Sequence, residues 1–115
     1  MDTMISADDL RAFGTRVLQT QGVPAADAEL VADSLVVAEQ WGHPSHGMLR
    51  LPWYVKRLRT GRIAPVTELT VLRDAGALVS VDGNSGVGQV VAARATDLAV
   101  DRKSTRLNSS HLVIS

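Results

Sequence analysis

The side chains best suited to chemistry lie between Trp41 and Arg50. This stretch, WGHPSHGMLR, contains His43, Ser45, His46 and Arg50 in a segment interrupted by glycine and proline. Histidine donates or accepts a proton near neutral pH, and the planar arginine fork holds a carboxylate through two parallel hydrogen bonds. These types suit the reduction of a 2-oxo acid, in which arginine anchors the carboxylate and histidine protonates the oxygen as hydride arrives. The alternative is a structural turn in which one histidine makes a local hydrogen bond.

Other chemistries fit this stretch poorly. His43 and His46 would need a further His, Asp, Glu or Cys to hold a metal ion, and Pro44 hampers a shared helical face. Ser45 lies in S-H-G rather than in the G-x-S-x-G of a hydrolase nucleophile. We therefore expect neither a metal site nor a serine nucleophile.

A glycine-rich run, DGNSGVG, covers residues 82–88. Val91 stands where the dinucleotide-binding fingerprint needs a third small residue, and no acidic residue ends a second strand about 20 residues later. The run is a weak candidate for a phosphate cradle, and a turn from a strand into a helix is the expected role.

Helical periodicity predicts the elements that must position the histidines. Ser6 is expected to cap a helix over residues 7–21, because S-x-x-D places its hydroxyl near free N–H groups, and Gly22 ends that helix. A second apolar stripe runs from Pro24, in a first-turn position, to about Gln40. The short connection forces the two helices to fold against each other as a hairpin.

Beyond the turn, the pattern changes from helix to strand. A third helix is expected to begin near Leu51, which makes Pro52 tolerable, and to end at Gly61. Two β-branched runs near residues 69–71 and 78–81 predict a strand pair. A fourth helix follows the glycine-rich run, with an apolar side formed by Val90, Val91, Ala95, Leu98 and Ala99. The expected class is α/β, or α+β within this chain.

The composition is that of one small globular domain. The chain has 115 residues, of which 45% are hydrophobic and 21% are charged, and it has no cysteine. This composition argues against disorder throughout, excludes disulfides and fits a reducing compartment. No stretch approaches the ~20 apolar residues of a membrane span, and Met1 leads into Asp2 rather than a basic signal-peptide start. Because the formal net charge is zero, a nucleic-acid partner is not expected. We expect a soluble, cytoplasmic protein without a membrane partner.

Charges are segregated along the chain. Acidic residues predominate from Asp2 to Glu39, and basic residues predominate from Gln40 to Arg73. Solvated helix faces explain most of these charges. The positive stretch also lies beside the clustered histidines, where it would steer an anionic small molecule. The basic run from Lys56 to Arg62 suggests either a phosphate contact or a solvated helix end.

The segment from Leu10 to Ala99 matches a known pattern. It includes Gly61-Arg62-Ile63 with Pro65 and the motif S-H-G-x-x-R-x-x-x-Y, which is formed by Ser45, His46, Gly47, Arg50 and Tyr54. It resembles the N-terminal third of the malate/L-lactate dehydrogenase family, NAD(P)H-dependent 2-oxo acid oxidoreductases distinct from the Rossmann-fold lactate and malate dehydrogenases. The fold would then be the start of a larger non-Rossmann dehydrogenase.

The resemblance implies roles for individual residues. His46 would be the catalytic histidine, a proton donor or substrate ligand, and Arg50 would contact the substrate carboxylate or order the site. Ser45 and Tyr54 would be supporting substrate-binding residues. The cofactor would be NAD or NADP, bound mostly by later segments, and the full-length enzyme would be a homodimer. Family members act on malate, lactate, ureidoglycolate, diketogulonate or cyclic imino acids, so the substrate would be a small 2-oxo or 2-hydroxy acid or a related imino acid.

The resemblance ends near residue 101. The family's next landmark is a strand followed by an N-S-x-H-F-G-like motif, and the run Asn108-Ser109-Ser110-His111 arrives too early and continues with Leu-Val. His111 is therefore not a candidate catalytic residue. The segment from Arg102 instead resembles read-through of sequencing-adapter DNA. We expect residues 1–101 to be the N-terminal portion of a dehydrogenase and residues 102–115 to be an unrelated, disordered or artefactual tail.

Two function classes remain open. The first is an oxidoreductase of this family, truncated here and inactive by itself. The second is a small helical protein-interaction module without catalytic activity, suggested by the short helices and the alanine-rich second helix. The small size and unpaired apolar stripes also predict marginal stability.

Overall fold

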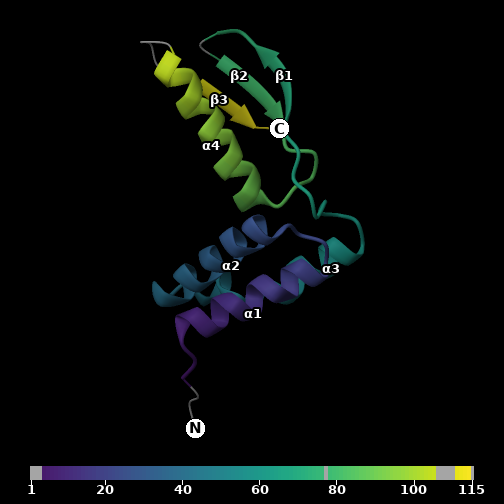
Figure 1. The fold of residues 1–115 in the computed structure, drawn as a ribbon, viewed down its shortest axis with the longest axis vertical. Helices are drawn as coiled ribbons and strands as arrows, with labels where there is room; N and C mark the ends of the chain where they lie inside the picture. Colours follow the sequence, from purple (N-terminus) through teal and green to yellow (C-terminus); the bar gives the residue numbers. More distant parts are fainter. Residues whose placement is uncertain (1–3, 77, 106–110, 115) are drawn as a thin grey trace. The chain divides into compact units, whose positions relative to one another are not determined.

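The computed structural model describes residues 4–76, 78–105 and 111–114 of the chain. It divides the chain into two compact units, Met1–Val66 and Thr67–Ser115. Helices form the first unit, whereas the second combines a sheet with one helix (Figure 1). The mixture of helices followed by strands and a further helix confirms the predicted class.

The first unit begins with the predicted helical hairpin. Helix α1 spans Ala7–Thr20, and α2 spans Ala25–Gln40. The two helices approach closely, because a Cβ atom at Gly14 would lie only 3.2 Å from the Cβ atom of Ala32. Their shared core consists of fully buried side chains, among them Leu18, Val31, Ala32, Leu35 and Val36. Pro24 is the N-cap residue of α2, one place before the predicted first-turn position.

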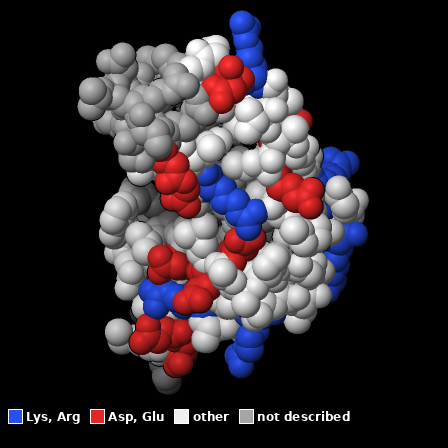
Figure 2. Space-filling model, turned by 45° about the horizontal axis from the view of Figure 1, so that its top comes forward, with Lys and Arg blue, Asp and Glu red and all other residues white. Residues whose placement is uncertain are grey.

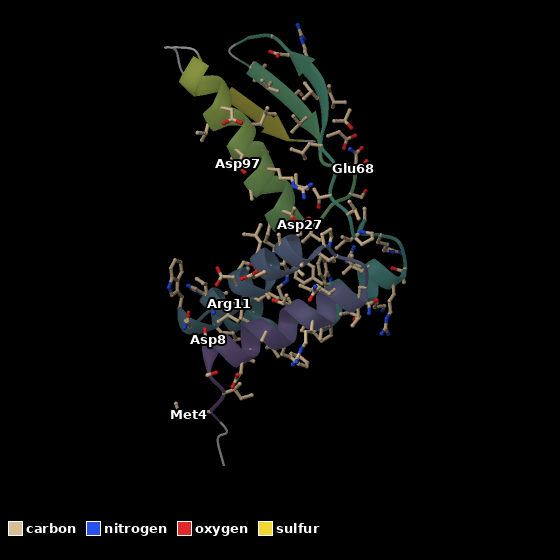
Figure 3. All side chains as sticks on the ribbon, viewed as in Figure 1. Met4, Asp8, Arg11, Asp27, Glu68 and Asp97 are labelled. Atoms are coloured by element: carbon tan, nitrogen blue, oxygen red, sulfur yellow. The ribbon has the colours of Figure 1, made fainter. Side chains whose placement is uncertain are left out.

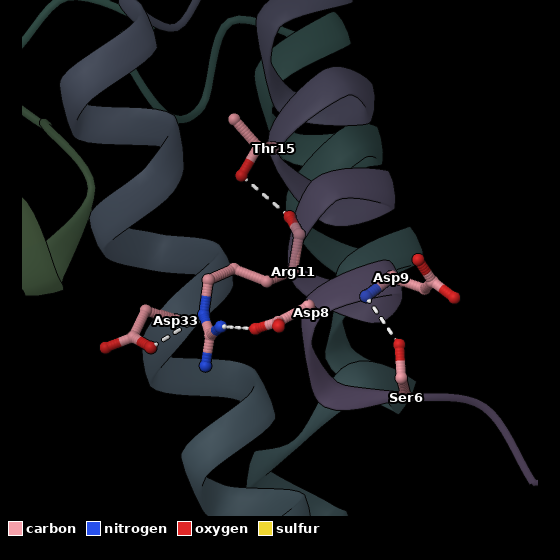
Figure 4. Close-up of polar contacts among 6 residues, drawn as sticks. All are labelled: Ser6, Asp8, Asp9, Arg11, Thr15 and Asp33. Atoms are coloured by element: carbon pink, nitrogen blue, oxygen red, sulfur yellow. Dashed lines mark hydrogen bonds and ion pairs between the residues drawn. The ribbon is translucent and has the colours of Figure 1, made fainter.

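Polar contacts fix the start of α1. The Ser6 hydroxyl accepts a hydrogen bond from the Asp9 N–H at 3.1 Å, as the S-x-x-D pattern predicts. Arg11 contacts Asp8 on its own helix at 2.8 Å and Asp33 on α2 at 2.9 Å. Figure 4 shows both contacts, and Figure 3 shows Arg11 and Asp8 on the first unit. Acidic side chains gather at the lower left of the face drawn in Figure 2, with a basic side chain among them. These ion pairs are solvated, so each adds at most about 1 kcal/mol.

Two 3-10 turns connect the hairpin to the next helix. Turn η1 spans Pro44–His46, η2 spans Met48–Arg50, and helix α3 spans Leu51–Arg59. Pro52 lies in the first turn of α3, where its missing N–H costs no intrahelical bond. Leu51, Tyr54 and Leu58 form the buried face of α3.

The helices of the first unit end in the same way. In α3, Gly61 adopts a φ of 75°, and the Arg62 N–H donates to the Arg57 carbonyl at 2.9 Å. In α2, Gly42 adopts a φ of 77°, and the His43 N–H donates to the Ala38 carbonyl at 2.9 Å. This Schellman geometry turns the chain back over the last helical turn.

We expect Gly61→Ala to lower the free energy of unfolding by about 1 kcal/mol, because alanine disfavours a left-handed backbone. No atom would clash with the added Cβ, so the cost comes from the backbone alone. Gly88→Ala is the control, because Gly88 has open space and no positive φ. Urea denaturation of the two variants checks this prediction, and an equal loss in both would contradict it.

The second unit is a small sheet covered by a helix. Strands β1 (Thr70–Asp74) and β2 (Leu78–Asp82) are antiparallel, and β3 (His111–Ile114) pairs in parallel with β2. Helix α4, Gly88–Thr105, follows β2 and precedes β3 (Figure 1). The core contains Val79 and Val81 of β2, which pack with Ala95 of α4.

The end of the chain differs from the expected tail. Helix α4 continues four residues past the predicted boundary at residue 101, and β3 is a third strand that the sequence pattern did not predict. The run Asn108–Ser110 lies outside the described residues. The boundary between dehydrogenase sequence and foreign tail stays a prediction.

No helix within the described residues is both long and apolar enough to span a membrane.

Candidate functional site

The histidine-containing turn is built on the end of α2. The hydrogen bond from the His43 N–H to the Ala38 carbonyl turns the chain back at Gly42. The His43 carbonyl then accepts a hydrogen bond from the His46 N–H at 3.0 Å, and this bond forms η1. Glycine and proline thus place both histidines in one short turn beside the helix, as the sequence predicts.

Ser45 and His46 are in direct contact. The Ser45 Oγ lies 3.1 Å from His46 Nδ1, and both residues are exposed. Because this bond engages Nδ1, the other ring nitrogen, Nε2, is the atom available to exchange a proton with a ligand.

His46 lines a groove of about 380 Å³ on the first unit. The lining residues of α2 and the turn are Ser34, Val37, Ala38, Trp41, His43 and His46. An imidazole in a mostly apolar groove is a suitable arrangement for moving a proton to a small bound molecule.

Gly47 has a packing reason to be glycine. A Cβ atom there would lie 2.5 Å from Glu39 Oε1, so a larger residue would push this carboxylate away from its position. The same Oε1 accepts a hydrogen bond from the Met48 N–H at 2.9 Å. Glu39 therefore ties the end of α2 to the start of η2, between His46 and Arg50.

We expect Glu39→Ala to lower the free energy of unfolding by about 1 kcal/mol, because the Met48 N–H loses a charged acceptor. Glu39→Gln retains a side-chain oxygen and should lose less than half of that amount. Urea denaturation measures both effects, and amide chemical shifts of residues 45–48 report whether the turn moves. Equal stability of Glu39→Ala and the unmodified chain would contradict the assignment.

Arg50 and Tyr54 both contact the ring of Trp53. The Arg50 guanidinium lies 4.8 Å from the ring centroid of Trp53, and that ring meets Tyr54 edge-on with centroids 5.0 Å apart. Tyr54 is buried, whereas Arg50 is partly exposed. Of the predicted site residues, Ser45 and His46 are thus brought together, and Arg50 and Tyr54 are joined through Trp53.

Known proteins resemble the part of the chain that contains these site residues. The sequence model of the malate/L-lactate dehydrogenase family matches residues 5–106. The chain belongs to the malate/L-lactate dehydrogenase family. The relatives in this family are named as dehydrogenases of hydroxy acids. Membership in the family therefore favours the oxidoreductase hypothesis over the interaction-module hypothesis.

Individual members of the malate/L-lactate dehydrogenase family are similar to this chain over most of its length. The chain is 39% identical to a malate dehydrogenase of Pyrococcus horikoshii over 98 residues, which cover 85% of this chain and 27% of the relative. It is 38% identical to an L-sulfolactate dehydrogenase of Methanocaldococcus jannaschii over 86 residues, covering 75% and 25% of the two chains. The solved Pyrococcus horikoshii malate dehydrogenase structure superposes with a TM-score of 0.84 at 37% identity, over 90% of this chain and 30% of that chain.

The family implies a nicotinamide cofactor, and the glycine-rich run was the sequence candidate for holding its phosphates. A Cβ atom at Gly86 would lie 2.8 Å from the Thr67 hydroxyl, and one at Gly83 would lie 2.9 Å from Val91. These two glycines therefore make room for the chain's own side chains, and their presence does not require a phosphate. The run joins β2 to α4, as predicted.

Among the described residues, no group of three or more His, Asp or Glu side chains is placed to hold a metal ion.

Two supporting residues were missed by the sequence reasoning. Glu39 was considered only as the end of the acidic stretch, and Trp53 was not considered. The spacing R-x-x-W-x-x-x-R from Arg50 to Arg57 was a usable signal, because residues three and four apart share a helix face. Nothing in the sequence marked Glu39, because its contact with Gly47 depends on the fold of the turn.

Proposed function

We propose that this chain contributes His46 and Arg50 to an enzyme that transfers a hydride between NAD(P)H and a small 2-oxo or 2-hydroxy acid. The observation that supports this most is the position of His46, which lines a groove and bonds to Ser45 through Nδ1. Family membership supplies the reaction class.

In the proposed reaction each residue has a limited task. His46 gives a proton from Nε2 to the substrate oxygen, and Ser45 holds the ring in orientation through Nδ1. Arg50 binds the substrate carboxylate through its fork, and the Trp53 ring keeps the guanidinium in place, with Tyr54 as the buried support of that ring. The bound nicotinamide supplies the hydride. In the reverse direction His46 accepts the proton.

The proposed function also includes the cofactor, the oligomeric state, the cellular location and the extent of the dehydrogenase portion. The cofactor is NAD or NADP, the complete enzyme is a homodimer in the cytoplasm, and it needs neither a nucleic-acid nor a membrane partner. Residues 1–101 are the dehydrogenase portion, and residues 102–115 are foreign to it. The family match runs to residue 106, five residues past this proposed boundary.

The 115-residue chain is proposed to be inactive by itself. It spans about 27% of the length of the Pyrococcus horikoshii malate dehydrogenase that it matches. Burial of a nicotinamide is expected to need segments that the longer relatives have beyond the matched part.

A chimera tests the proposed role of Arg50. It joins residues 1–101 to the remaining sequence of the Pyrococcus horikoshii malate dehydrogenase. We expect it to oxidise NADH with 2-oxo acids such as oxaloacetate and pyruvate but not with acetone, which lacks a carboxylate. Arg50→Lys should raise KM for the 2-oxo acid about tenfold, because lysine cannot replace a bidentate fork.

Steady-state kinetics of the chimera measure this effect. Arg73→Lys on the exposed strand β1 is the matched control and should leave KM within twofold. An unchanged KM for the 2-oxo acid in Arg50→Lys, or turnover of acetone equal to that of the 2-oxo acids, would contradict the proposal that Arg50 binds the substrate carboxylate.

A further inference from the structure

A second cavity lies at the C-terminal end of α3, apart from the His46 groove. It encloses about 440 Å³, and its lining residues are Trp53, Lys56, Arg57, Thr60 and Arg62. None of these residues lines the His46 groove.

Local geometry explains why three cationic side chains meet there. Lys56 and Arg57 follow Trp53 by three and four positions, so all three side chains share one face of α3. Arg62 lies beyond the helix, and its N–H donates to the Arg57 carbonyl at 2.9 Å. The Schellman turn at Gly61 thus folds Arg62 back to the same cavity.

The cavity has positive charge without a counter-ion. Residues 40–67 include no Asp or Glu, and none of the lining residues is acidic. Among the described residues, the ion pairs of Arg11 do not involve Lys56, Arg57 or Arg62, and no carboxylate lies within ion-pair distance of these three side chains. The negative end of the α3 dipole offsets only about half of one charge.

Two contacts of the lining residues favour a preorganised anion site over a solvated helix end. The Arg57 guanidinium lies 4.4 Å from the Trp53 ring centroid, which holds it against the wall of the cavity. The Thr60 hydroxyl donates to the Lys56 carbonyl at 3.0 Å, so the three cationic side chains are the donors that face a ligand.

We propose that this cavity binds the phosphate group of a small phosphorylated molecule. A phosphate dianion presents three acceptor oxygens, which match two guanidinium forks and one ammonium group. The partly exposed Trp53 ring offers an apolar surface to the group that bears the phosphate. None of the cationic groups is assigned to the dehydrogenase site, and Trp53 is the residue that the two sites share, because it contacts Arg50 and also lines this cavity.

Titration of the 115-residue chain tests the site. Inorganic phosphate and phenyl phosphate are added at constant ionic strength, with chloride as the reference anion. Binding is followed by calorimetry and by the fluorescence of Trp53 in a Trp41→Phe background. We expect saturable binding of one phosphate per chain, with phenyl phosphate binding more tightly than inorganic phosphate.

Charge-neutral variants locate the binding. Lys56→Gln combined with Arg62→Gln should weaken phenyl phosphate binding by about tenfold or more, because two charged donors are lost. Arg59→Gln is the matched control: Arg59 is on the same helix and carries the same charge, but it contacts Gln21 and does not line the cavity. It should change affinity less than twofold, and circular dichroism confirms that each variant folds.

Several outcomes would overturn the proposal. These are absence of saturable binding, equal weakening by Arg59→Gln, and displacement of phosphate by chloride at equal ionic strength. Each would indicate a diffuse positive surface rather than a phosphate site. Binding of an RNA oligonucleotide without any binding of phenyl phosphate would also reject it.

Discussion

His46→Ala in the chimera is expected to lower kcat by about a hundredfold or more, because general acid catalysis by a positioned side chain contributes about that much. The proton then has to come from water. Stopped-flow and steady-state NADH oxidation measure the loss.

A neighbouring histidine provides the control for this prediction. His43 lines the same groove, but the hydrogen bond to Ser45 belongs to His46. His43→Ala should therefore change kcat much less than His46→Ala does. A change within twofold for His46→Ala, in a chimera that still binds NADH, would count against the general-acid role.

Leu35→Ala in the 115-residue chain is expected to lower the free energy of unfolding by about 2–5 kcal/mol, the usual cost of a cavity in a core. Leu35 is 1% exposed between the helices of the hairpin. Because the chain is small and expected to be marginally stable, this loss should leave much of the variant unfolded at room temperature.

Leu30→Ala is the matched control, since it makes the same change on the same helix. Leu30 is 38% exposed, and its truncation should cost less than about 1 kcal/mol. Thermal and urea unfolding, followed by circular dichroism, compare the two variants. A similar loss in both, or a high unfolding midpoint for the unmodified chain, would contradict this account of the core.

The helices were predictable because their signals are local. Ser6 caps α1 and Gly22 follows its end, while Pro52 fits only the first turn of α3. These positions depend on backbone preferences that act within a few residues. The antiparallel pair β1 and β2 was predictable for the same reason, since a short turn joins the two strands.

The third strand was not predictable from local patterns. β3 pairs in parallel with β2, and the whole of α4 separates them along the chain. A run as short as Leu112 to Ile114 has no periodicity of its own, and its partner is set by the packing of α4. Sequence reasoning therefore predicted a strand pair where the unit has a three-stranded sheet.

The candidate site was predicted in its residues but only partly in its geometry. Adjacent residues such as Ser45 and His46 had to lie close together, and they are hydrogen-bonded. The support of Met48 by Glu39 depends on the path of the chain from α2 through η1 to η2. Such contacts are set by the tertiary fold, so the sequence motif alone did not specify them.

The proposed function requires this chain to act as one part of a longer hydroxy acid dehydrogenase, since it spans about 27% of the Pyrococcus horikoshii relative. The most direct test compares NADH oxidation by the 115-residue chain and by the chimera, with oxaloacetate and pyruvate as substrates under identical conditions. We predict turnover by the chimera and none above the uncatalysed rate by the chain. Robust turnover by the 115-residue chain, or no turnover by a folded chimera that binds NADH, would contradict the claim.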